Sequence, residues 1–298
     1  MHHAARINRI ILLTAFFSAP ALAQPTPPSP AIPATPATPA LPTYTLTTPV
    51  SRYALKLVRV PARPSEAAEK PDKPAESAAP RPELRPFYIS ATEVTWDCLD
   101  PFVYRLDLEN PDAEADATTR PSKPYIPPDR GYGHEGYPAI SVTFRTAEAY
   151  CEWLTEQTGL KFRLPTEDEW EHAASAGNPA RAIDDEPRLG WYRENSQAQT
   201  HPVAQREPNA WGLYDTLGNA GEWVVGRDGK PVLKGGSFRT PRDRLSFTLA
   251  EKQEPSWNAS DPQMPKSRWW LPDAPFAGFR IVLEADPKTG EPLKAGSK

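Results

Sequence analysis

The spacing of apolar residues predicts two amphipathic helices in the middle of the chain. In the first, apolar side chains recur at i, i+3, i+4 and i+7 from Ala147, with Thr143 before them as a candidate N-cap and Gly159 after them. In the second, Thr166 and Glu169 have the spacing of a capping box, in which each side chain bonds to the other's backbone N–H. We therefore expect one helix after Thr143 and another after Thr166, each with one face in the core.

Shorter apolar runs with the alternation typical of strands are spread along the rest of the chain. They cover residues 53–60, 84–94, 223–226, 232–235 and 279–283. Asp228 and Gly229 lie between the third and fourth runs and favour a hairpin turn there. With a short helix expected near residues 95–103, the pattern predicts an α+β domain with two main helices, short strands and much irregular structure.

The first 23 residues have the pattern of a secretory signal peptide. A basic start is followed by the apolar run Ile10–Phe17 and then by Ala21-Leu22-Ala23, after which we expect cleavage. The apolar run is too short for a stable anchor, and no later segment is apolar enough to cross a membrane. Residues 24–42 form a Pro/Thr/Ala-rich linker that we expect to be extended. The sequence thus predicts a secreted or periplasmic bacterial protein.

Composition sets the limits of the globular domain, which we expect to cover residues 43–285. Residues 61–82 are rich in Glu, Lys, Ala and Pro and are expected to form a disordered insertion, because they cannot bury apolar surface. Residues 286–298 are expected to be a polar, frayed tail. The net charge of -4 provides no electrostatic surface for nucleic acid, so we expect no nucleic-acid partner.

Cys98 and Cys151 are the only two cysteines of the chain. In an oxidising compartment they could form one disulfide, but both lie among core-like residues and can equally be two buried thiols. The sequence does not give the distance between them, so both alternatives stay open.

The segment Pro208–Trp223 is dense in residues with specific structural roles. It combines aromatic residues with Gly212 and Gly218, and Asn219 tolerates the left-handed conformation. We expect an irregular core loop, whose backbone groups need hydrogen-bond partners. A bound cation is one way to satisfy them, and Asn219 and Glu222 are a candidate pair of oxygen ligands.

Seven short motifs follow one another along the chain. They are F-Y-I-S-A-T-E-V-T (87–95), Y-P-A-I-S-V-T-F (137–144), A-E-A-Y-C-E-W-L (147–154), R-L-P-T-E-D-E-W-E-H-A (163–173), N-A-W-G-L-Y-D-T-L-G-N-A-G-E-W (209–223), K-G-G-S-F (234–238) and G-F-R-I-V (278–282). Together and in this order they resemble the family of the formylglycine-generating enzyme, or sulfatase-modifying factor. The resemblance implies a C-type-lectin-like fold that is stabilised by calcium.

In that family the G-N-x-x-E-W loop supplies calcium ligands, and Asn219 and Glu222 match those positions. Asn195 matches the start of a second family calcium site, although residues 197–201 are too few for its remaining ligands. From the residues alone, Asn219 and Glu222 can equally be a turn asparagine and a capping carboxylate. The resemblance favours structural calcium.

The resemblance also implies copper-dependent oxidation of a sulfatase cysteine, and here the sequence departs from the family. Thr240 and Leu245 stand where the family has its two copper-binding cysteines, and neither side chain is a ligand for Cu(I). Cys151 matches a family cysteine whose disulfide partner is replaced by Ile281. Two other residues of the family's pocket are present, Trp223 and Ser237, and each can equally have only a structural role. We therefore expect neither copper binding nor formylglycine generation.

Iron is not expected either. Other members of the superfamily hold iron with a histidine cluster, whereas His134, His172 and His201 have no H-x-x-x-H spacing on a helix.

Two hypotheses for the function remain. In the first, the chain is a binding or scaffold module for a protein, peptide or carbohydrate, with Arg239, Arg242, Trp257 and Trp269 at its recognition surface. The alternative for these tryptophans is that they fill the core. In the second hypothesis, the chain is an enzyme with altered chemistry that uses Ser237 and Trp223 in the same pocket.

Overall fold

The computed structural model describes residues 41–47, 54–65, 81–110, 118–124, 126–178, 188 and 190–296. All of them belong to the unit Thr38–Lys298. The predicted signal peptide, and most of the predicted linker and insertion, lie outside the described residues. Within the described part of the chain, no helix combines the length and the apolar character that crossing a membrane requires.

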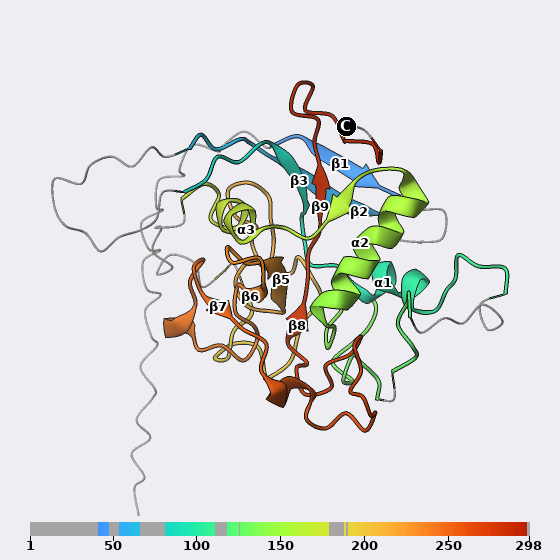
Figure 1. Cartoon of the computed structure of the whole chain (residues 1–298). Helices are drawn as coiled ribbons and strands as arrows, with labels where there is room; N and C mark the ends of the chain where they lie inside the picture. Colours follow the sequence, from blue (N-terminus) through green and yellow to red (C-terminus); the bar gives the residue numbers. More distant parts are fainter. Residues whose placement is uncertain are drawn as a thin grey trace, which may run out of the picture. The chain divides into compact units, whose positions relative to one another are not determined.

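The first sheet has five strands in the order β1-β2-β3-β9-β4, with antiparallel neighbours throughout (Figure 1). Their bounds are Thr43–Leu46 (β1), Leu55–Val60 (β2), Phe87–Ser90 (β3), Phe162–Arg163 (β4) and Val282–Glu284 (β9). The predicted runs contain β2 and β3 and overlap β9, which extends one residue beyond its run, to Glu284. The sequence pattern missed β1 and the two-residue β4, which is too short to show an alternation.

The second sheet has four strands in the order β7-β6-β5-β8. Their bounds are Gly221–Val225 (β5), Pro231–Lys234 (β6), Ala250–Glu251 (β7) and Ala277–Gly278 (β8). The predicted hairpin at Asp228 and Gly229 is confirmed, since β5 and β6 pair antiparallel and Gly229 has a φ of 75°. Strand β8 runs parallel to β5, which brings the G-F-R motif beside the end of the central loop.

In the described residues, three α-helices accompany the sheets: Trp96–Val103 (α1), Phe144–Thr158 (α2) and Glu167–Ala174 (α3). The predicted caps are confirmed. The Thr143 hydroxyl accepts a bond from the backbone of Thr146, and Gly159 ends α2 with a φ of 70°. Thr166 and Glu169 form both bonds of the capping box at the start of α3. Two short 3-10 helices, Arg242–Arg244 and Pro255–Asn258, lie between β6 and β8.

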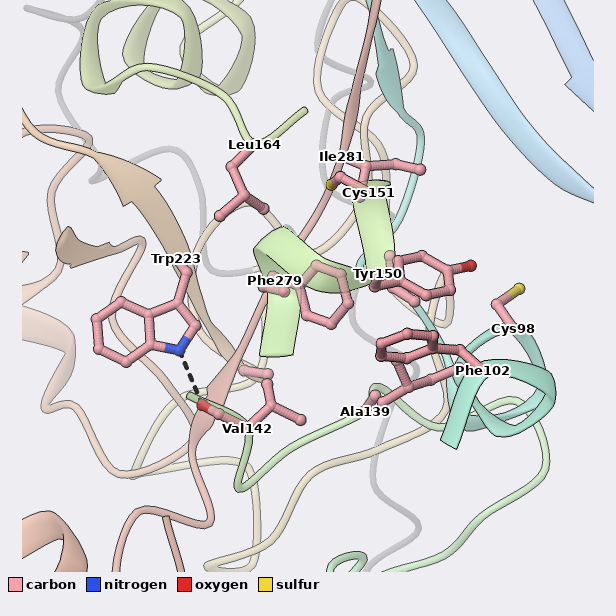
Figure 2. Packing of buried hydrophobic residues seen from close by; sticks show 14 of the residues in the cluster. Cys98, Phe102, Ala139, Val142, Tyr150, Cys151, Leu164, Trp223, Phe279 and Ile281 are labelled. Carbon is pink, nitrogen blue, oxygen red and sulfur yellow. Dashed lines mark hydrogen bonds between the residues drawn. The ribbon is translucent and has the colours of Figure 1, made fainter. Parts of the chain in front are cut away.

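The main hydrophobic core joins α1 and α2 to both sheets (Figure 2). Tyr150 of α2 packs edge-on against Phe279, with ring centroids 5.6 Å apart. Cys98 and Cys151 lie in this core as free thiols, and burial raises the pKa of each. The structure thus shows two separate buried thiols rather than a disulfide. Ile281, at the family's partner position for Cys151, belongs to the same cluster.

The described part of the predicted tail, residues 286–296, folds back onto the domain instead of fraying. Leu160 forms an isolated bridge with Lys294, and the Tyr88 hydroxyl donates to the carbonyl of Gly290 at 3.0 Å. These contacts connect the tail to β3 and to the segment between α2 and β4, although its polar composition alone had suggested an unattached end.

Candidate functional site: the central loop and the adjoining pocket

The loop Pro208–Trp223 is irregular up to Ala220, as its sequence predicts, and its last three residues begin β5. Several residues of the irregular part have a positive φ. Gly218 and Asn219 have φ values of 85° and 49°. Asn209 fixes the start of the loop, because its side-chain amide donates to the last carbonyls of α3, those of Ala173 and Ala174. The loop therefore satisfies the end of a helix while it turns into β5.

The end of the loop is held by a buried ion pair between Glu222 and Arg280. The Arg280 guanidinium donates to both carboxylate oxygens of Glu222, and both side chains are 1% exposed. It also donates to the backbone carbonyls of Ser90 and Tyr214, each at 2.9 Å. The Trp170 indole donates to the same carboxylate at 2.6 Å. The buried guanidinium of Arg280 thus connects β3, the central loop and the G-F-R segment.

Asn219 forms hydrogen bonds to protein groups through both ends of its side-chain amide. Its Oδ1 accepts from the backbone N–H of His201 at 2.9 Å, and its Nδ2 donates to Glu93 at 3.0 Å. Asn195, the predicted start of a second calcium site, closes a turn by accepting from the N–H of Tyr192 at 2.7 Å. A calcium ligand needs a free oxygen directed at the ion.

As arranged here, Glu222 and Asn219 do not fit one calcium ion. Arg280 occupies the cation's place against Glu222, and the oxygen of Asn219 already has a donor. We therefore derive no role from calcium at this loop.

Next to the ion pair lie two buried carboxyl groups with incomplete hydrogen bonding, Glu93 and Asp215. Each has one side-chain oxygen that is bonded, to Asn219 and to the backbone of Ala204 respectively. The other oxygen of each has no partner among the described residues. Burial, with Asp215 and Glu222 nearby, raises the pKa of Glu93 well above its ordinary value. Burial is also the largest cause that raises the pKa of Asp215 to about 6.

A pocket of about 410 Å³ opens beside the Gly-Gly-Ser segment that follows β6. It is lined by residues from the turn after Gly236, from the first 3-10 helix and from the segment around the second, namely Ser237, Arg239, Thr240, Pro241, Arg244, Leu249, Glu251, Lys252, Glu254 and Trp257. Among the described lining residues there is no histidine and no cysteine.

The two positions that the resemblance assigns to copper-binding cysteines, Thr240 and Leu245, come together beside this pocket. A Cβ placed on Gly236 would meet the Leu245 side chain at 2.7 Å and the Thr240 hydroxyl at 3.0 Å, so both side chains close over this glycine. Both are buried, and the Thr240 hydroxyl accepts from the N–H of Ser237 at 2.9 Å. A hydroxyl and a methyl group replace two thiolates, and this pair does not fit copper.

The residues predicted to recognise a ligand are only partly brought together. Arg239 and Trp257 line the pocket, whereas Arg242 lies on the neighbouring 3-10 helix and Trp269 in the core. Trp257 and Trp269 are 7% and 3% exposed, which agrees with the alternative that these indoles fill the core. Trp223, predicted for the pocket, is fully buried and donates to the carbonyl of Val142, as Figure 2 shows.

The histidines make separate local contacts. His134 bonds to Asp100, His172 lies beside the carbonyl of Pro61, and His201 stacks on Trp191. In the part of the chain that the structure describes, no group of three or more His, Cys, Asp or Glu residues could hold a metal ion.

A larger cavity, of about 540 Å³, lies at the start of α3, but most of its charged groups are paired with one another. Arg163 forms a bidentate pair with Glu169, and Arg227 bonds to Glu167 and Asp168. Because most of these charges already have partners, this cavity is a weaker candidate for a ligand site than the smaller pocket.

Comparison with known proteins agrees with these motifs and this fold. Residues 47–285 match the model of the sulfatase-modifying factor enzyme 1-like domain. The chain belongs to the sulfatase-modifying factor family. It is 32% identical over 192 residues to the formylglycine-generating enzyme of Bos taurus. The aligned region covers 52% of this chain and 46% of that protein. The chain is also 30% identical over 122 residues to the inactive C-alpha-formylglycine-generating enzyme 2 of Bos taurus, over 34% of this chain and 38% of that protein.

Among solved structures, variable protein 1 of Treponema denticola has a similar fold. The TM-score is 0.55 at 20% identity, with 80% of this chain and 98% of the other covered. This likeness supports the predicted sulfatase-modifying-factor fold. The chain spans less than half the length of the two curated relatives of Bos taurus that it matches.

Several residues of the site were not singled out from the sequence. Glu93 and Arg280 stand inside two of the family motifs, and a charged residue among apolar neighbours is a signal that could have identified them. Asp215 shares the central loop with Asn219. Arg244 and Lys252 carry no such signal, because exposed basic residues are common and only the fold shows that they line one pocket.

Proposed function

We propose that this chain is an exported binding module of the sulfatase-modifying factor family, which recognises a peptide or carbohydrate in the pocket beside Ser237. The observation that carries the proposal is the pair Thr240 and Leu245. They close over Gly236 without a thiol, while the pocket above them stays open at about 410 Å³. The similarity to a relative whose name describes it as inactive supports a member of this family without formylglycine generation. The proposal of export rests on the signal-peptide pattern of residues 1–23.

The geometry gives the enzymatic alternative less support. The Ser237 hydroxyl oxygen accepts a bond from the backbone N–H of Arg239 at 3.3 Å. Activating a serine as a nucleophile requires a base within hydrogen-bond reach, and Ser237 bonds to no such side chain among the described residues. A binding role needs no such group.

The test is a peptide and glycan array probed with three forms of the full chain. Arg244→Trp fills the mouth of the pocket from an exposed position, and Arg242→Trp adds the same bulk on the same 3-10 helix outside the pocket lining. We expect ligands that are retained by the parent chain and by Arg242→Trp but lost by Arg244→Trp. If no array ligand depends on Arg244 in this way, the pocket is not the recognition site and the proposal fails.

A further inference from the structure

Three cationic side chains line the pocket. They are Arg239, Arg244 and Lys252, and none of them forms an ion pair with another described residue. Arg163, in contrast, forms ion pairs with both Glu169 and Glu284. Three unpaired cationic groups around one cavity leave its positive charge available to a ligand.

Arg239 is held in place at the pocket wall. Its guanidinium carbon lies 3.6 Å from the centre of the Phe276 ring, and Phe276 is 2% exposed. Stacking on a buried ring fixes the plane of the guanidinium while its N–H groups stay free to donate in that plane. Burial lowers the pKa of Arg239, against the opposing effect of Glu251, as expected for a cation that lacks a direct partner.

Two hydroxyl groups beside Arg239 are also available as donors. The Ser237 oxygen accepts from the N–H of Arg239, and the Thr240 oxygen accepts from the N–H of Ser237. Each hydroxyl carries one proton of its own, and neither donates that proton to another described residue. Their backbone bonds therefore hold both oxygens in place and leave both protons for a ligand.

We propose that the pocket binds an oxyanion, the carboxylate, phosphate or sulfate group of its ligand, through Arg239, Ser237 and Thr240. An oxyanion offers only acceptors, which matches a wall that offers a guanidinium and two hydroxyl protons. The exposed Arg244 and Lys252 add attraction at the mouth. This inference rests on the proposed binding function and specifies the chemistry of its ligand.

Two carboxylates also line the pocket, and their negative charge repels an anion. Glu254 accepts from the Ser256 hydroxyl at 3.2 Å, and Glu251 lies near enough to Arg239 to affect its pKa without forming an ion pair with it. Removing the charge of Glu251 should therefore strengthen the binding of an oxyanion, whereas removing the charge of Arg239 should weaken it.

The experiment is calorimetric titration of the full chain with sodium phosphate, sodium sulfate and trisodium citrate, at constant ionic strength in chloride. We expect saturable binding of at least one probe, about tenfold weaker in Arg239→Gln, since a charge-assisted hydrogen bond is lost. Glu251→Gln should bind several-fold more tightly, and Arg242→Gln, outside the lining, should bind as the parent does. A preference for citrate would indicate a carboxylate ligand, and a preference for phosphate or sulfate would indicate the corresponding ester.

Two results would overturn the inference. One is the absence of saturable binding of any probe, and the other is binding that Arg239→Gln and Glu251→Gln leave unchanged. If the array at the same time shows uncharged ligands that Arg244→Trp loses, the pocket is a binding site for a neutral ligand. The proposed function would then stand while the oxyanion assignment fails.

Discussion

The buried carboxyl group of Asp215 should make the protein less stable at neutral pH than in mild acid. Asp215 is 1% exposed, with one oxygen bonded to the N–H of Ala204 and the other without a partner among the described residues. Its pKa is raised to about 6 from an ordinary value of 3.8, first by burial and further by Glu222, and Arg280 opposes this rise. Each pKa unit corresponds to about 1.4 kcal/mol, so this rise corresponds to about 3 kcal/mol of unfolding free energy.

The direction of this pH dependence follows from the number of protons that the folded and the unfolded chain bind. Between about pH 4 and pH 6 the folded chain keeps a proton on Asp215 that the unfolded chain has released, so the free energy of unfolding falls as the pH rises through this range. Above about pH 6 both states are ionised and this loss is complete. Glu93, whose pKa is also raised, acts in the same direction.

Asp215→Asn removes the charge and keeps an oxygen for the N–H of Ala204. Asparagine also tolerates the φ of 53° at this position. We expect the variant to be more stable than the parent by up to about 3 kcal/mol at pH 7.5 and nearly equal to it at pH 4. Guanidinium unfolding followed by tryptophan fluorescence at both pH values measures the difference. A variant that is equally or less stable than the parent at pH 7.5 would refute the argument.

Three further predictions concern the Glu222–Arg280 ion pair and the side chains around Gly236. Arg280→Met leaves Glu222 buried without its partner and should cost about 3–5 kcal/mol of unfolding free energy, part of which a second change, Glu222→Gln, should restore; if the double variant is no more stable than the single one, the ion pair is not the cause. Thr240→Cys combined with Leu245→Cys should bind Cu(I) in a chelator competition, which neither single change should achieve, because the two side chains meet over Gly236; equal affinity in all variants would contradict that geometry. Because Arg280 supplies the cation at Glu222, the melting temperature should not change in EDTA; a decrease that calcium reverses would restore the calcium assignment.

The local features of the fold could be predicted from the sequence. The caps of α2 and α3 and the hairpin at Gly229 depend on residues within a few positions of one another. Strands of two residues, such as β4 and β8, could not be predicted, because only pairing with distant strands defines them.

The site depends on contacts between residues that are far apart in the chain. Glu222 and Arg280 are 58 positions apart, and Asn219 and Glu93 are 126 apart. The sequence identified Asn219 and Glu222 as polar residues that needed partners, and calcium was one chemically reasonable answer. It could not show that an arginine from another motif would reach Glu222. Family motifs placed Thr240 and Leu245 correctly as a pair, but only the fold shows what lies above them.

We propose that the pocket of this sulfatase-modifying factor domain binds a ligand and does not oxidise a thiol. The most direct measurement is to incubate the full chain with copper, oxygen and a cysteine-containing sulfatase peptide, and to follow the peptide by mass spectrometry and with an aldehyde-reactive probe. We predict that the cysteine stays unchanged, because the side chains of Thr240 and Leu245 offer no thiolate to the metal. Formation of an aldehyde at the cysteine in the presence of this chain alone would contradict the account.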